Sequence, residues 1–147
     1  TDAASLYINE LPGENHLYYG ANAGHGPAPD ALIAAQSFMA AVVKGEERAK
    51  VTWSRGADGA LTVACDGKEA RATLWQAHSD SRDFLRSRWT PSPVRGESPW
   101  TVKVDAPDNG WTAYYVTVQS RTEAGPLPLN SSTPITITPD TYQFPAR

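Results

Sequence analysis

The sequence is poor in cysteine and has no long hydrophobic run among its 147 residues. Because Cys65 is the single cysteine, an intramolecular disulfide is excluded, and no Cys/His cluster has the spacing of a structural zinc site. The longest apolar run, residues 31–43, is interrupted by Gln36 and Ser37 and is too short to cross a bilayer. The first residues also lack the basic segment of a signal peptide. We therefore expect no membrane span, and either a cytosolic chain or a fragment of a processed precursor.

A strong excess of charge of one sign is missing too. Thirteen basic and 16 acidic residues give a formal net charge of -3, which argues against nucleic-acid binding by bulk charge. An apolar content of 40%, with five Trp and six Tyr, is sufficient for a core and is far from the composition of disordered chains. We expect a folded protein without a cofactor.

The first part of the chain, residues 1–46, predicts two helices separated by a strand and a loop. Asp2 can cap a short helix that ends before Pro12, and residues 16–20 have the pattern of a strand. The run Ala-Asn-Ala-Gly-His-Gly-Pro, residues 21–27, favours sharp turns over regular structure. We therefore expect a loop there.

A longer helix is predicted from Asp30 to about Lys44, with Pro29 at its start and Gly45 at its C-terminal end. Its apolar residues occur on most of its circumference rather than in one stripe. A single strand at residues 16–20 cannot cover such a helix. We therefore expect other chain segments to cover it on more than one side.

The second part, residues 47–147, predicts short strands without an intervening helix. Turn signals such as Asp58-Gly59 separate these strands. Such a succession over about a hundred residues is typical of a two-sheet sandwich of immunoglobulin or fibronectin type. The predicted strands are residues 50–54, 61–65, 70–76, 84–89, 100–104, 111–120 and 134–138. The predicted fold class is thus an α/β part followed by an all-β sandwich.

The tryptophans allow two interpretations. They can fill the core or a domain interface, where large aromatic side chains dominate the burial energy, or they can form a flat surface on which sugars stack. We favour the core, because several lie within or at the start of apolar strands. The five are Trp53, Trp75, Trp89, Trp100 and Trp111.

His25 is the strongest candidate for a chemical role. It lies between two glycines, in a loop that follows the predicted strand and precedes the predicted helix. From such a position an imidazole can project over the edge of a sheet, and its ordinary pKa suits a general base. A partner carboxylate is not evident from the sequence. The alternative is a surface-loop histidine without a function.

The remaining candidates have ordinary interpretations. We expect His16 and His78 to be solvated and Cys65 to be a small buried residue. The charged stretch around Asp80 and Asp83 is expected to be a solvated loop, with a cation site or an active-site rim as the alternative. Three serines lack the flanking glycines of a strained nucleophile turn: Ser5, Ser37 and Ser54.

Several segments carry a resemblance to a known family. They are Asp-Ala-Ala-Ser-Leu-Tyr-Ile-Asn-Glu-Leu-Pro-Gly-Glu (2–14), Asn-Ala-Gly-His-Gly (22–26), Leu-Trp-Gln-Ala (74–77), Arg-Asp-Phe (82–84) and Gly-Trp-Thr-Ala-Tyr-Tyr-Val (110–116). In them the chain resembles the secreted PhoPQ-activated pathogenicity-related proteins, α/β-hydrolases similar in fold to the prolyl oligopeptidase group. This resemblance implies that residues 1–46 supply the last strand, the histidine loop and the last helix of a hydrolase domain. It also implies that His25 is the histidine of a Ser…Asp…His triad.

The chain departs from that pattern because it has no Gly-x-Ser-x-Gly nucleophile elbow and no strand that could hold the acid. Our hypothesis is therefore the C-terminal part of a secreted or periplasmic serine hydrolase that acts on a peptide or ester. The serine and the aspartate would lie on a larger N-terminal polypeptide of the same precursor, separated by proteolytic processing. The alternative is a non-catalytic secreted binding or signalling module whose sandwich recognises protein or carbohydrate.

Overall fold

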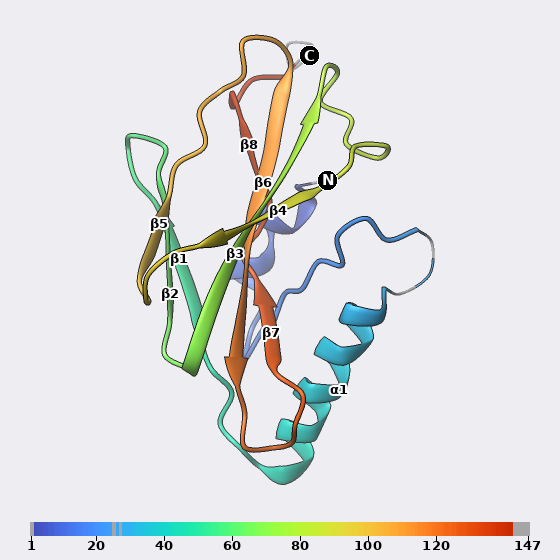
Figure 1. The fold of residues 1–147 in the computed structure, drawn as a ribbon, viewed down its shortest axis with the longest axis vertical. Coiled ribbons are helices and arrows are strands. Elements are labelled where there is room, and N and C mark those ends of the chain that lie inside the picture. The colour runs from blue at the N-terminus through green and yellow to red at the C-terminus, as the bar shows by residue number, and fades with distance from the viewer. Residues whose placement is uncertain (1, 25, 27, 143–147) are drawn as a thin grey trace.

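The fold was analysed in a computed structural model that describes residues 2–24, 26 and 28–142. Within these residues two short 3₁₀ turns, one α-helix and eight strands follow one another along the chain (Figure 1). The elements are η1 (Ala3–Leu6), η2 (Ile8–Glu10), α1 (Pro29–Lys44), β1 (Val51–Arg55), β2 (Leu61–Cys65), β3 (Lys68–Ser79), β4 (Thr90–Val94), β5 (Trp100–Val102), β6 (Trp111–Arg121), β7 (Leu129–Ser132) and β8 (Thr136–Thr138).

The strands form two antiparallel sheets. The first has the order β1-β2-β5, and the second has the order β4-β3-β6-β7. β8 pairs with the first part of β6, whereas β7 pairs with its last part. The long strands β3 and β6 form the centre of the second sheet, with Leu74 opposite Val116. The predicted β-rich second part is therefore confirmed as two antiparallel sheets.

The main core lies between the two sheets, as the alternation of side chains along the strands requires. Trp100 of β5 is only 2% exposed, and its indole N–H donates to the Gly96 carbonyl over 3.1 Å. This confirms the expected core position for one tryptophan. The buried residues of this core are Leu61, Val63, Ala72, Trp100, Val102, Tyr114, Val116 and Val118.

A second apolar cluster lies on the outer face of the second sheet and joins the first part of the chain to the strands. Tyr115, which follows a core residue on β6, is buried on this opposite face. Its ring centroid lies 5.2 Å from that of Tyr19, 5.0 Å from that of Trp89, and 6.3 Å from that of Trp75, which is stacked on it. Residues before and after position 46 therefore share one packed cluster.

The predicted strand at residues 16–20 is wrong, although the segment is extended. Among the described residues, the hydrogen bonds from its backbone to β7 involve Ser132 alone: the Ser132 N–H donates to the Leu17 carbonyl, and the Tyr19 N–H donates to Ser132 Oγ. The next residue, Thr133, already donates its N–H to the Val116 carbonyl of β6. Because the chain turns back to β6 at this point, β7 offers no further backbone for a ladder.

The predicted long helix is confirmed as α1. It begins with Pro29 in its first turn and ends at Gly45, whose positive φ of 67° is the left-handed conformation that stops a helix. Its buried face, made by Ala34, Ser37 and Ala41, lies against β7 (Figure 1). Within the described part of the chain, no helix is long and apolar enough to span a membrane.

The strand predicted at residues 84–89 is also wrong. The Asp83 carboxylate accepts the Leu85 N–H, and the Ser79 hydroxyl donates to the Asp83 carbonyl, so the polar stretch closes into turns. Phe84 remains buried in the outer cluster, and the strand begins later, at Thr90.

The short helix predicted near Asp2 proves to be the two 3₁₀ turns η1 and η2. The Asp2 side chain makes no capping hydrogen bond to η1, and the Ser5 hydroxyl donates to the Asp2 carbonyl instead. A side chain that bonds the backbone locally in this way competes with a regular helix.

Candidate functional site: the histidine loop

The candidate catalytic residue, His25, lies outside the described residues. The described residues on both sides of it nevertheless define how the loop is attached. We use the term histidine loop for residues 21–28, which connect the extended segment to α1.

The two ends of the histidine loop are in close contact. A Cβ atom at Gly20 would lie only 2.8 Å from the Ala28 Cβ, closer than side-chain carbons approach one another. Any other residue at this position would have to push the two ends apart. Gly20 therefore allows the loop to close at its base.

A hydrogen bond just outside this contact closes the loop a second time. The Tyr18 hydroxyl donates to Asp30 Oδ2 over 2.8 Å, and Asp30 Oδ1 accepts the Ala31 N–H in the first turn of α1. Burial, together with the bonded Asp30 carboxylate, raises the pKa of Tyr18 above its ordinary value. Tyr18 is therefore a neutral donor at physiological pH.

A third attachment joins the loop to the second sheet. The Asn22 side-chain amide donates to the Trp89 carbonyl over 3.0 Å, and its oxygen accepts the Trp89 N–H over 2.8 Å. Asn22 has a positive φ of 56°, a conformation that asparagine tolerates better than most residues. We call this pair of bonds the Asn22–Trp89 clasp. It fixes the loop to the segment immediately before β4.

The described residues of the loop border a hollow at the surface. The described residues 21–24, 26 and 28–30 line a shallow hollow of about 610 Å³. Cβ atoms at Gly24 and Gly26 would meet no described atom within 4 Å. These two glycines are therefore not required by packing against the described chain, in contrast to Gly20.

The described lining of this hollow offers little chemistry of its own. It contains no serine, threonine or cysteine, and its one carboxylate, Asp30, already accepts hydrogen bonds at both oxygens. The described lining therefore supplies neither a nucleophile nor a free carboxylate.

The other histidines lie away from the histidine loop. His16 is half-buried and partnered, since its Nε2 lies 2.8 Å from Glu14 Oε1 and its Nδ1 lies 3.3 Å from Ser131 Oγ. The expectation that it is solvated is wrong. His78 is exposed and lies 3.1 Å from the Asp80 carboxylate, as expected of a solvated histidine.

Cys65 and the charged stretch show no sign of a reactive or metal site. Cys65 is partly buried, and this burial raises the pKa of its thiol, which makes it a poor nucleophile. Among the described residues, no group of three or more His, Cys, Asp or Glu side chains is arranged to hold a metal ion.

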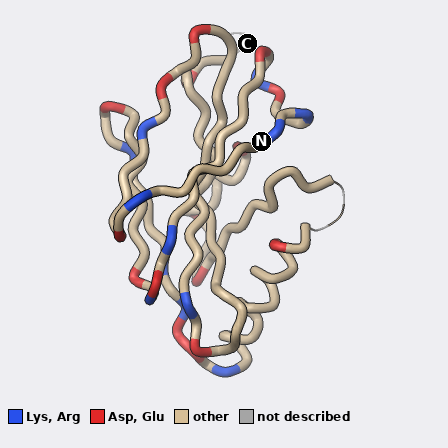
Figure 2. Tube along the Cα trace, viewed as in Figure 1, with Lys and Arg blue, Asp and Glu red and all other residues tan. Residues whose placement is uncertain are grey.

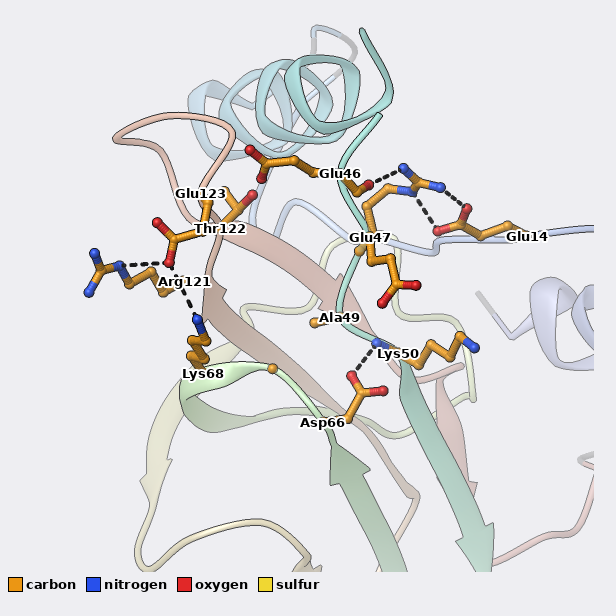
Figure 3. Close-up of a pocket in the computed structure, with 12 residues that line it drawn as sticks. Glu14, Glu46, Glu47, Ala49, Lys50, Asp66, Lys68, Arg121, Thr122 and Glu123 are labelled. Carbon is orange, nitrogen blue, oxygen red and sulfur yellow. Dashed lines mark hydrogen bonds and ion pairs between the residues drawn. The ribbon is translucent and has the colours of Figure 1, made fainter. Parts of the chain in front are cut away.

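A larger, charged cleft lies at the opposite end of α1 (Figure 3). It has a volume of about 740 Å³ and lies between residues 46–50, the β2–β3 turn and the end of β6. Several of its charges pair with one another: Lys68 Nζ lies 3.6 Å and Arg121 Nε lies 4.0 Å from Glu123 Oε1. The Asp66 carboxylate accepts the Lys50 backbone N–H. The 16-residue helix separates this cleft from the histidine loop by about 24 Å. It is therefore not part of the candidate site.

At one side of this cleft, Glu14 joins the extended segment to the chain after α1 (Figure 3). Arg48 Nε donates to Glu14 Oε1 over 2.6 Å, and a second guanidinium nitrogen contacts Oε2. The hydrogen bond from Arg48 lowers the pKa of Glu14 to about 2, and His16 contributes to this lowering.

Replacement of Glu14 by Gln is expected to remove a pH-dependent part of the stability. The pKa of Glu14 is lower in the folded protein than in the unfolded chain, so the ionised carboxylate stabilises the fold above pH 4.5. This stabilisation is lost as the pH falls towards 2. Thermal melts from pH 7 to pH 2 should therefore show Glu14→Gln below wild type at pH 7 and equal to it at the acid end. A constant difference across this range would contradict the assignment.

The described residues thus form a two-sheet β-protein with one helix and a loop clasped to its second sheet. The family model of the PhoPQ-activated pathogenicity-related protein matches residues 1–85, more than half of the 147 residues. The chain therefore belongs to this family. The match includes the histidine loop, α1 and β1 to β3, so it crosses the predicted division at residue 46. Comparisons with curated proteins and with solved structures found no match.

Proposed function

We propose that this chain supplies the triad histidine, His25, of a secreted serine hydrolase that cleaves peptides or esters. His25 takes the proton from a serine hydroxyl during its attack on the carbonyl carbon and returns it to the leaving group. The serine and the orienting aspartate belong to a larger N-terminal polypeptide of the same precursor. Family membership over the range that contains the Gly-His-Gly sequence is the observation that carries this proposal.

The attachment of the histidine loop supports the proposal. A base must be held within hydrogen-bond reach of the proton that it takes, so its loop must be anchored. The contact at Gly20, the Tyr18–Asp30 bond and the Asn22–Trp89 clasp anchor both ends of the loop. No described atom lies within 4 Å of a Cβ built at Gly24 or Gly26, which suits contact with a second polypeptide and a substrate there.

In the same proposal, the sheets form an immunoglobulin-like sandwich. The immunoglobulin pattern places the first, second and fifth strands in one sheet and the third and sixth in the other. The orders β1-β2-β5 and β4-β3-β6-β7 follow it, and β4 lies at the edge beside β3, where the variable type has an additional strand. Proline at two positions of β4, Pro91 and Pro93, is typical of an edge strand.

The exposed side of α1 is a second argument for a larger partner polypeptide. No charged residue lies between Asp30 and Lys44, as Figure 2 shows along the helix. Successive helical residues turn by about 100°, which places Met39 and Val43 opposite the buried Ala34. Met39 is 55% exposed and Val43 is 79% exposed in this chain. In the intact hydrolase, we propose, the N-terminal polypeptide covers this face.

Replacement of Met39 by Lys is expected to destabilise the intact protein by on the order of 3 kcal/mol or more, because a buried charge would lack a partner. The matched control is Leu85→Lys, since Leu85 is an exposed apolar residue outside the helix. The control should change the free energy of unfolding by no more than about 0.5 kcal/mol. Equal effects of the two substitutions in urea unfolding would argue that the helix face stays exposed.

A fluorophosphonate probe tests the proposed function itself. The intact protein, with this chain and its N-terminal polypeptide, should be labelled on one serine, and peptide mapping should place the label outside residues 1–147. A protein that is not labelled would favour the non-catalytic binding module. A label on a serine of this chain would overturn the proposed division of the triad.

A further inference from the structure

Asn22 is an exposed polar residue with two hydrogen bonds to the backbone of one distant residue. Its amide group satisfies both the N–H and the carbonyl of Trp89, 67 positions along the chain. The Trp89 ring packs edge-on against the buried Tyr115, with 5.0 Å between centroids. The Trp89 carbonyl and N–H, which hold Asn22, therefore belong to a residue whose ring is packed on the outer cluster of the second sheet.

From this geometry we infer that Asn22 is a positioning residue for catalysis and that the second sheet, through the Asn22–Trp89 clasp, is part of the catalytic unit. This inference rests on the proposed role of His25. Asn22 lies three residues before His25 in the sequence. Its proposed role requires no contact with the substrate. It acts by holding the first half of the histidine loop against the segment that leads into β4.

The clasp suits a positioning role better than a role in stability. The side chain of Asn22 is exposed and belongs to neither apolar cluster, so its removal leaves both cores intact. Among the described residues, Gly20 and Tyr18 also attach the loop, but both lie at its base. Asn22 is the described attachment beyond the base, on the N-terminal side of His25 in the sequence. Misplacement of a catalytic group by about 1 Å can lower a rate by about 100-fold.

Two substitutions of Asn22 in the intact protein distinguish the effect of losing the side-chain amide from the effect of changing the backbone conformation. Asn22→Gly removes the amide and keeps the positive φ without strain, whereas Asn22→Ala removes the amide and disfavours that φ. With p-nitrophenyl butyrate as the substrate, both variants should lower kcat by about 10- to 100-fold. KM should change by less than about twofold, because the clasp makes no contact with substrate.

The matched control is Asn130→Ala. Asn130 lies on β7 and also makes a side-chain hydrogen bond on the second sheet. Its Oδ1 accepts a hydrogen bond from Gln119 Nε2 of β6 over 3.1 Å. This control should keep the wild-type kcat. Circular dichroism melts should show the same melting temperature for Asn22→Gly and for wild type within about 4 °C.

The outcomes separate this inference from the proposed function. Wild-type kcat in both Asn22 variants, with an inactive His25→Ala, would overturn the inference and leave the proposed function standing. Unfolding of both Asn22 variants would also overturn it, because Asn22 would then be structural. Full activity of His25→Ala would overturn the proposed function and this inference together.

Discussion

Replacement of His25 by Ala in the intact protein is expected to lower kcat/KM for p-nitrophenyl butyrate by about a thousandfold or more. In a triad the histidine accepts the serine proton in the transition state, and loss of one member costs several orders of magnitude in rate. The two flanking glycines leave the substitution with little to disturb locally, so the melting temperature should stay close to that of wild type.

The other two histidines of the chain are the matched controls. His78→Ala removes an exposed imidazole, and His16→Ala removes one that is hydrogen-bonded to Glu14 and Ser131. Neither lies at the histidine loop, so both variants should keep wild-type kcat/KM. Activity of His25→Ala within about threefold of wild type would refute the catalytic role.

Replacement of Trp100 by Ala is expected to destabilise the protein by about 3–5 kcal/mol, the usual cost of emptying a large aromatic site. The ring is 2% exposed between the sheets, and the substitution also leaves the Gly96 carbonyl without its indole donor. Trp111→Ala is the control, because Trp111 is only partly buried and lies at the start of β6. It should cost clearly less.

Urea unfolding of both variants measures this difference. A loss of less than about 1 kcal/mol for Trp100→Ala would show that the core between the sheets does not depend on this side chain. Unfolding of Trp100→Ala also tests the sequence-based interpretation that the tryptophans are structural.

Much of the two-sheet arrangement is predictable because alternation along a strand determines which face each side chain occupies. Tyr114 and Tyr115, adjacent in the sequence, lie in the two different apolar clusters. Where alternation is weak, prediction fails. β7 has the polar sequence Leu-Asn-Ser-Ser, and its position depends on pairing with β6 rather than on its own pattern. β4 contains two prolines, which disfavour a strand in any position except an edge.

The attachment of the histidine loop was only partly predictable. Gly-His-Gly marks His25, and Gly20 and Asp30 lie near it in the sequence. Asn22 gives no comparable signal, because its partner is the backbone of Trp89, whose identity is irrelevant to the two hydrogen bonds. Only the packing of the second sheet brings the two residues together, and no local pattern encodes it.

The rate of fluorophosphonate labelling of the intact protein, compared between wild type and His25→Ala, tests the central claim most directly. The probe reacts only with a serine that a base has activated, and it needs no knowledge of the natural substrate. The account predicts rapid labelling of the wild type and a rate at least about a hundredfold lower in the variant, at the same protein concentration and pH. Equal labelling rates would contradict the claim that His25 is the base.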